Sequence, residues 1–210
     1  MVRGIARSKC RTSGFTLVEL VAVIAIVIVL LTIAVSLLGN TRGEALRSGS
    51  EQFSSLVEQA RTSAITRRRP VAMAIAEPGT AGFDDDQCRI GLFELDEWKE
   101  GEAVSGRLIQ RWHSLPDGIV FFGGEVDSLA NVKDAASVNL TWKNGSESAE
   151  FPALVFSARG GLLAPPGSES VVVALGNGTY RNGEAVRTGS SGDRTIRIGR
   201  VVARAWNLES

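Results

Sequence analysis

Few side chains in this chain could perform catalysis or hold a metal. His113 is the only histidine, which excludes a cluster of histidine ligands and a Ser-His-Asp arrangement. Asp84, Asp85 and Asp86 form an acidic run without the glycine and distal glutamate of a calcium loop, so we interpret it as a solvated loop. Cys88 has only Arg89 as a nearby cation, and we expect a half-buried structural thiol. The sequence therefore predicts no enzyme activity, no metal site and no cofactor.

One acid beside an apolar segment points to another kind of chemistry. From Leu20 to Leu38 the chain has 19 residues, of which only Thr32 and Ser36 are not apolar. About 20 apolar residues span a bilayer, so this length predicts a membrane helix. Glu19 precedes the segment directly, and no basic residue lies between Gly14 and Asn40. A charge in a spanning helix costs on the order of 3 kcal/mol at its centre and less near the interface, so an acid kept there indicates a function.

The residues before the apolar segment limit the alternatives. They include four basic residues and no acid, namely Arg3, Arg7, Lys9 and Arg11. Such a cationic start stays on the cytoplasmic side of the membrane. A secretory signal peptide cut after Ala34-Val35-Ser36 is one alternative, although its apolar region would exceed the usual 7–15 residues. An uncleaved signal anchor is another. Neither alternative gives Glu19 a role.

The stretch Gly14-Phe15-Thr16-Leu17-Val18-Glu19, followed by the apolar run, resembles the type IV prepilin signature. The resemblance implies that a prepilin peptidase on the cytoplasmic face cuts after Gly14 and that the new amino terminus, Phe15, is N-methylated. It also implies that Glu19 acts in assembly, because its carboxylate would neutralise the Phe15 amine of a neighbouring subunit in a filament. Cys10 would leave with the leader, so the mature chain would keep Cys88 as a lone thiol without an internal disulfide.

The rest of the chain shows one helical region and then a β-rich region. Between Thr41 and Arg69 there is no proline, and apolar residues recur every three or four positions, which predicts an amphipathic helix. Arg67, Arg68 and Arg69 complement the helix dipole at its end, with a nucleic-acid or lipid contact as the alternative, and Pro70 stops the helix. From there the apolar period becomes two, which indicates an antiparallel β domain of one sheet or two packed sheets. The predicted strands are Val71–Ala76, Arg89–Leu95, Arg107–His113, Gly118–Phe122, Ser137–Trp142, Pro152–Phe156, Ser170–Leu175 and Thr195–Ala205.

Two features of this region lie outside the predicted strands. The polar, glycine-rich segment Gly176–Asp193 is predicted to be a mobile loop or long hairpin that does not pack. The four tryptophans, Trp98, Trp112, Trp142 and Trp206, could anchor a partner, but we expect them to pack in the core or on a sheet face.

Two further stretches are similar to the GspH/FimT family of prepilin-like proteins. The first is FSSLVEQARTSAITRRRPV, from Phe53 to Val71, and the second comprises FSARGG at Phe156 and RTIRIGRV at Arg194. The resemblance implies an α+β, pilin-like fold, in which a long N-terminal helix packs on an antiparallel β domain. It divides the chain into a leader peptide at 1–14, a transmembrane and assembly helix at 15–38, an amphipathic continuation at 39–69 and a periplasmic β domain at 70–210.

The function implied by this resemblance is that of a minor pseudopilin of a type II protein secretion system. Its partners would be prepilin peptidase, other pseudopilins or pilins, the inner membrane, and secreted cargo or the secretion channel. The chain would be a single-pass protein of the bacterial inner membrane, with a cytoplasmic N-terminus and a periplasmic C-terminal domain. The alternative is a FimT-like minor pilin of a type IV pilus, acting in pilus assembly or DNA uptake. A membrane-tethered envelope enzyme is a third class, but the chain offers no catalytic residues for it.

The charge pattern bears on DNA uptake. Without the leader the chain has 19 basic and 23 acidic residues, whereas nucleic-acid binders usually carry a basic surface. The candidate nucleic-acid contacts are Arg197, Arg200 and Arg204, which we place on the last strand or pair of strands, with Arg200 and Arg204 on one face. FimT-like minor pilins of DNA-uptake pili tend to end in a Gly-Arg-x-Arg element, and here Gly199-Arg200-Val201-Val202 lacks its second arginine. We therefore do not expect nucleic acid as a partner.

Overall fold

The computed structural model describes residues 17–38, 41–80, 83, 85–135, 137–142, 146–181, 183–188 and 192–208. It divides the chain into two compact units, residues 1–41 and 42–210. Within the described residues the three helices are α1 (Leu17–Leu38), α2 (Thr41–Arg67) and the short α3 (Val132–Ala135). The strands are β1 (Val71–Ala76), β2 (Arg89–Leu95), β3 (Val104–Leu108), β4 (His113–Ser114), β5 (Ile119–Phe122), β6 (Ser137–Trp142), β7 (Glu147–Phe156), β8 (Leu162–Ala164), β9 (Val171–Arg181), β10 (Glu184–Arg187), β11 (Arg194–Ile198) and β12 (Ala205–Leu208).

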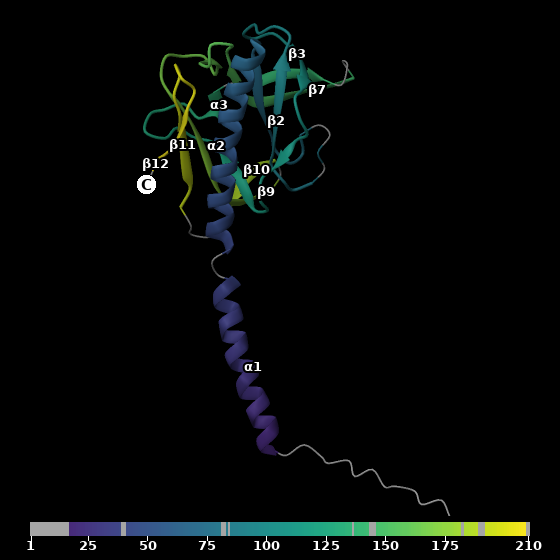
Figure 1. Cartoon of the computed structure of the whole chain (residues 1–210), viewed down its shortest axis with the longest axis vertical. Helices are drawn as coiled ribbons and strands as arrows, with labels where there is room; N and C mark the ends of the chain where they lie inside the picture. Colours follow the sequence, from purple (N-terminus) through teal and green to yellow (C-terminus); the bar gives the residue numbers. More distant parts are fainter. Residues whose placement is uncertain are drawn as a thin grey trace, which may run out of the picture. The chain divides into compact units, whose positions relative to one another are not determined.

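The predicted amphipathic helix corresponds to α2, whose apolar stripe is fully buried. Its core residues share a cluster with residues of β1, β2, β5, β7, β9 and β11, and they are Leu46, Phe53, Leu56, Val57, Ala60 and Ala64. In Figure 1, α2 passes between β11 and β12 on one side and β2, β3 and β7 on the other. The α+β prediction is thus confirmed, and the helix joins two sheets through one core.

The end of α2 is tied to the first sheet by charged side chains. Arg67 contacts the Glu94 carboxylate at 2.8 Å, and Arg69 contacts Asp96 at 3.2 Å. Arg107 of β3 reaches the same Glu94 at 3.2 Å. Arg68, between the two helix-end arginines, has a positive φ of 55°, which ends the helix before Pro70. Arg67 and Arg69 therefore anchor the helix to the end of β2, where Arg107 of β3 shares the Glu94 carboxylate, an arrangement that the sequence did not predict.

The first sheet closes on itself into a small barrel. β1, β2, β3, β6 and β7 pair in that order, and β7 pairs back to β1. Alternate residues of each strand face opposite sides of a sheet, so Ala72 and Ala74 of β1 point into the barrel while Val71 and Met73 point towards α2. Aromatic side chains fill the interior, with Phe93 in ring contact with both Trp112 and Trp142. The prediction of one sheet or two packed sheets did not include this closure, or the parallel pairing of β3 with β6.

The second sheet has the order β10-β9-β11-β12, with β5 also paired to β9. Here the prediction that residues 176–193 do not pack was wrong in part. Gly176, Asn177 and Gly178 are buried within β9, and β9 and β10 form the hairpin. A Cβ at Gly178 would lie 2.5 Å from Val120, so this glycine permits close packing of β9 against β5. The predicted strand Thr195–Ala205 is also corrected, because β11 ends at Ile198 and β12 begins at Ala205.

Candidate functional site

The predicted assembly residue, Glu19, maps to the start of α1. Glu19 lies in the first turn of this 22-residue helix. Gly14 and Phe15, the predicted cleavage and methylation residues, lie outside the described residues. The large apolar side chains described in α1 are all exposed, from Leu17 at 78 % to Val27 at 46 %. A contiguous apolar surface of this kind marks a contact with a membrane or with other proteins. Within the part of the chain that the structure describes, no helix meets the length and hydropathy of a membrane-crossing segment.

Arg197 is exposed on the solvent face of β11. Its partner in the strand register is Trp206 of β12, and the neighbouring pair on the same face is Thr195 with Leu208. The Trp206 side chain is 50 % exposed, so the expectation that this tryptophan packs in the core or on a sheet face holds only for half of its surface. Arg197, Trp206, Leu208 and Ser170 line a shallow recess of about 360 Å³. This arginine is available to a ligand.

Arg200 is engaged with its own chain. Its Nε donates to the carbonyl oxygen of Glu169 at 3.0 Å, and its terminal nitrogens donate to the carbonyl oxygens of Pro165 and Pro166. Burial lowers the pKa of Arg200 from its ordinary value, because the guanidinium has lost part of its water. The backbone amide of Leu162 also donates to the Arg200 carbonyl at 2.9 Å. Arg200 therefore fastens the turn after β11 to the 162–169 segment.

Arg204 extends towards α2. Its Nε lies 3.9 Å from the Glu58 carboxylate of α2, so it pairs weakly with the helix. The sequence placed Arg200 and Arg204 on one face of one strand, but they lie in the turn between β11 and β12 and contact different parts of the domain. The structure therefore does not assemble Arg197, Arg200 and Arg204 into a common basic site.

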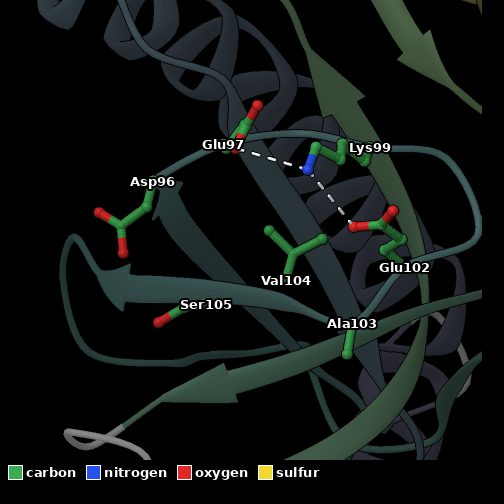
Figure 2. A pocket seen from close by; sticks show the side chains of 7 residues that line it. All are labelled: Asp96, Glu97, Lys99, Glu102, Ala103, Val104 and Ser105. Atoms are coloured by element: carbon green, nitrogen blue, oxygen red, sulfur yellow. Dashed lines mark ion pairs between the residues drawn. The ribbon is translucent and has the colours of Figure 1, made fainter.

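An acidic recess lies between β2 and β3. Asp96, Glu97 and Glu102 line this hollow of about 190 Å³ together with Lys99. Figure 2 shows the Lys99 ammonium between the carboxylates of Glu97 and Glu102, at 3.9 and 3.7 Å, while Asp96 is turned away from them. Among the described residues, no group of three metal-ligating side chains could hold an ion. The charges of the recess are paired with one another or, at Asp96, with Arg69, and no pattern in the sequence predicted it.

A buried polar cluster joins the two sheets around Cys88. The Cys88 thiol lies 3.7 Å from the Tyr180 hydroxyl of β9, and Lys133 of α3 pairs with Glu77 at 2.8 Å. The Lys133 ammonium also lies 5.4 Å from the centre of the Tyr180 ring. Burial raises the pKa of Cys88 to about 11, and burial likewise raises the pKa of Tyr180. Cys88 is fully buried and not half-buried as predicted, and its protonated thiol is structural.

The other sequence candidates remain scattered. Asp85 pairs with Arg89, Asp86 is exposed, and Asp84 lies outside the described residues. His113 is in β4, opposite Ile90 of β2. These residues do not converge on a common site with Cys88 or with Arg197.

Comparisons with known proteins cover most of the chain. The family model for the type II transport protein GspH matches residues 49–200, and the model for the prokaryotic N-terminal methylation motif matches residues 9–35. No curated protein matches the chain. Among solved structures, the type IV minor pilin FimU of Pseudomonas aeruginosa strain PAO1 is similar at 18 % identity and a TM-score of 0.42, covering 81 % of this chain and 92 % of that one.

A second crystal form of FimU gives 17 % identity, a TM-score of 0.36, and coverage of 78 % of this chain and 93 % of that one. The methylation motif covers residues 9–14 of the predicted leader, the predicted cleavage junction and Glu19, while the GspH match runs from within α2 to the turn after β11. The family resemblance found in the sequence is thus confirmed: the protein belongs to the type II transport protein GspH family.

Proposed function

We propose that this protein is a minor pseudopilin of a type II secretion system, made as a precursor and assembled into a periplasmic pseudopilus. One observation carries the proposal. A single chain combines the N-terminal methylation motif, on an apolar helix with Glu19 in its first turn, with a GspH-type domain whose core is built around α2. A GspH domain on such a helix is suited to incorporation into a pilin-like filament.

In this proposal each part of the chain has a separate task. Residues 1–14 are a leader that prepilin peptidase removes after Gly14, and Phe15 becomes the methylated N-terminus. Residues 15–38 anchor the chain once in the inner membrane and pack in the filament, where Glu19 pairs with a neighbouring subunit. Residues 39–69 carry the helix into the periplasmic domain of residues 70–210. That domain contacts other pseudopilins, secreted cargo or the secretion channel, and it performs no catalysis.

The buried stripe of α2 supports this assignment of separate tasks to the parts of the chain. Because Phe53, Val57 and Ala60 are fully buried against the sheets, this stripe of α2 is part of the folded domain and is not available to a filament contact, whereas the other side of α2 is exposed. The large apolar side chains described in α1 are exposed instead. We therefore assign lateral packing in a filament to α1, and specific partner contacts to the surface of the domain, which includes the exposed side of α2.

The test is complementation of a strain of the source bacterium from which this gene has been deleted. The wild-type chain should restore export of secreted enzymes, and mass spectrometry should find a mature chain that begins at N-methylated Phe15. Gly14→Glu should remain uncut and fail to restore export, whereas Gly4→Glu, the same change elsewhere in the leader, should be cut. A mature chain beginning at Leu37 would identify an ordinary signal peptide. Loss of pili with normal export in the deletion strain would assign the protein to a type IV pilus.

A further inference from the structure

β12 lies at the edge of the second sheet, with β11 on one side only among the described strands. The amide of Gly199 donates to the Arg204 carbonyl at 2.9 Å, which fixes the phase of the hydrogen bonds between β11 and β12. Because such bonds alternate along an antiparallel pair, the amides and carbonyls of Ala205 and Asn207 point away from β11. An edge of this kind presents donors and acceptors with which another strand can pair.

β10, another edge strand of the same sheet, is protected, and β12 is not. β10 has Glu184 and Arg187 at its ends, and the Arg187 guanidinium pairs with Asp193 at 2.5 Å. Charged side chains on an edge strand discourage pairing with foreign strands. β12 consists of Ala-Trp-Asn-Leu and has neither a charge nor a proline, and half of its Trp206 side chain is exposed.

The outer face beside this edge holds a recess that suits the methylene groups and the carboxylate of one acidic side chain. The Trp206 indole lies across Gly199, since a Cβ on Gly199 would stand 2.8 Å from the ring. The indole forms one wall of the recess, and Arg197 supplies a cation to it. None of the described carboxylates forms an ion pair with Arg197, in contrast to Arg187 and Arg204 of the same sheet region.

We propose that β12 binds an extended, acidic segment of another polypeptide as an added strand. The segment's backbone would pair with Ala205 and Asn207, and one of its acidic side chains would pack its methylene groups on Trp206 and extend its carboxylate to Arg197. An added strand would lie about 10 Å from β11, two strand spacings away. A glutamate and an arginine extended towards each other across β12 can cover that separation. This proposal holds for either kind of filament and goes beyond the function proposed above.

Charge and shape favour a polypeptide over nucleic acid at this site. Residues 151–210 contain 7 basic and 4 acidic side chains, so the region attracts an acidic partner. A duplex, however, requires several cations on one face. Arg200 donates to the carbonyl oxygens of Pro165, Pro166 and Glu169, and Arg204 pairs with Glu58. Neither arginine therefore adds its charge to that of Arg197 on the outer face of β11. An open strand edge contributes to binding only if the ligand has a peptide backbone.

The experiment measures binding of labelled peptides to the full chain in a non-ionic detergent, by fluorescence anisotropy. The probes are an alternating Val-Glu octapeptide, its Val-Lys counterpart, and a Val-Glu octapeptide N-methylated on its valine amides, which face β12 when the glutamates face Arg197. The Val-Glu peptide should bind at least tenfold more tightly than the Val-Lys peptide. N-methylation should weaken its binding at least tenfold, because it removes the amides that pair with β12.

Two charge reversals on the same strand separate a specific contact from general attraction. Arg197→Glu should reverse the preference, so that the Val-Lys peptide binds more tightly. Arg194→Glu makes the same change of charge on the opposite face of β11 and should keep the original preference. Circular dichroism would verify that both variants remain folded.

Four results would overturn the proposal. They are the absence of saturable binding by the wild-type chain, equal behaviour of the two charge reversals, full binding of the N-methylated peptide, and self-association of the chain that Arg197→Glu abolishes. The last result would identify a second copy of this chain as the occupant of β12.

Discussion

The guanidinium of Arg200 and the backbone carbonyl of Glu169 are joined by a hydrogen bond of 3.0 Å between residues 31 positions apart in the chain. Two further donations from the same guanidinium, to Pro165 and Pro166, complete the attachment. The turn after β11 is thereby fixed to the segment between β8 and β9. An arginine that the sequence offered as a ligand contact is a structural connection instead.

Replacing Arg200 should therefore destabilise the domain. Hydrogen bonds from a charged donor contribute about 1.5–3 kcal/mol, so Arg200→Ala should lower the free energy of unfolding by about 2 kcal/mol. Urea denaturation of residues 42–210, followed by circular dichroism, measures the change. Arg194→Ala, on an exposed arginine of β11, is the control and should stay within about 0.5 kcal/mol of the wild type. Equal stability of the two variants would show that the carbonyl contacts of Arg200 contribute nothing.

Binding of duplex DNA should be weak and non-specific. The three candidate arginines do not share a surface, so residues 42–210 should bind a DNA duplex only in the range of about 1–100 μM at physiological salt. Electrophoretic shift and anisotropy titrations measure this affinity. Arg197→Ala is the informative variant, because Arg200→Ala also perturbs the fold. A submicromolar dissociation constant that Arg197→Ala abolishes would favour a DNA-uptake pilus instead.

The sequence predicted the strands well where an apolar segment is bounded by turn-forming residues. Val71–Ala76, Arg89–Leu95 and Ser137–Trp142 coincide with β1, β2 and β6. It failed at residues 195–205, where Arg200 is drawn out of the strand by carbonyl oxygens distant in the sequence. Gly176 and Gly178 suggested a loop, yet a Cβ at either would lie within 2.7 Å of a neighbouring atom, so these glycines serve close packing. Local patterns could not show either contact, and they could not show that β7 closes onto β1.

The carboxylate of Glu94 should make stability depend on pH in the acid range. Burial alone would raise the pKa of Glu94, but the hydrogen bonds from Arg107 and Arg67 outweigh burial and hold its pKa below the ordinary value. A lowered folded-state pKa stabilises the protein above the unfolded-state pKa, about 4.3, and this contribution disappears as the pH falls through the folded-state pKa. Glu94→Gln should therefore be less stable by about 1 kcal/mol at pH 7.

The measurement for Glu94 is a series of urea denaturation curves of wild type and Glu94→Gln between pH 7 and pH 2.5. The difference in unfolding free energy should be constant from neutral pH to about pH 5 and shrink on further acidification. Glu97→Gln is the control, because its side chain is 75 % exposed and it contacts only Lys99 among these charged groups. A difference for Glu94→Gln that is independent of pH would contradict the assignment.

Cys88 should be unreactive in the folded protein. With a pKa of about 11, set mainly by burial, about one thiol in a thousand is ionised at pH 8, and the sulfur is also covered. Iodoacetamide should alkylate Cys88 in residues 42–210 at least about 100-fold more slowly in buffer than in 8 M urea. Mass spectrometry of timed samples gives both rates. Comparable rates would show that the cluster around Tyr180 opens readily.

Glu19 should be required for assembly but not for cleavage or for folding of the domain. After removal of residues 1–14, Phe15 would carry an amine about one helical turn from Glu19, near the edge of the hydrocarbon. Opposite charges attract more strongly in low dielectric than in water, so a carboxylate paired with the amine of an adjacent subunit would favour one axial offset between chains. Glu19→Val removes this preference while adding apolar surface to α1, which should leave membrane insertion intact.

The expected result for Glu19→Val is a chain that is cut after Gly14 and has a wild-type domain, yet neither crosslinks to other pseudopilins nor supports secretion. Crosslinking in intact cells and secretion assays in the complemented deletion strain measure the two activities. Glu19→Asp keeps the negative charge one methylene closer to the helix and should retain part of each. Val18→Ala, a substitution at the adjacent exposed position, should retain both in full. Wild-type crosslinking and secretion by Glu19→Val would contradict the assembly role, because the carboxylate would then be dispensable for the contact between subunits.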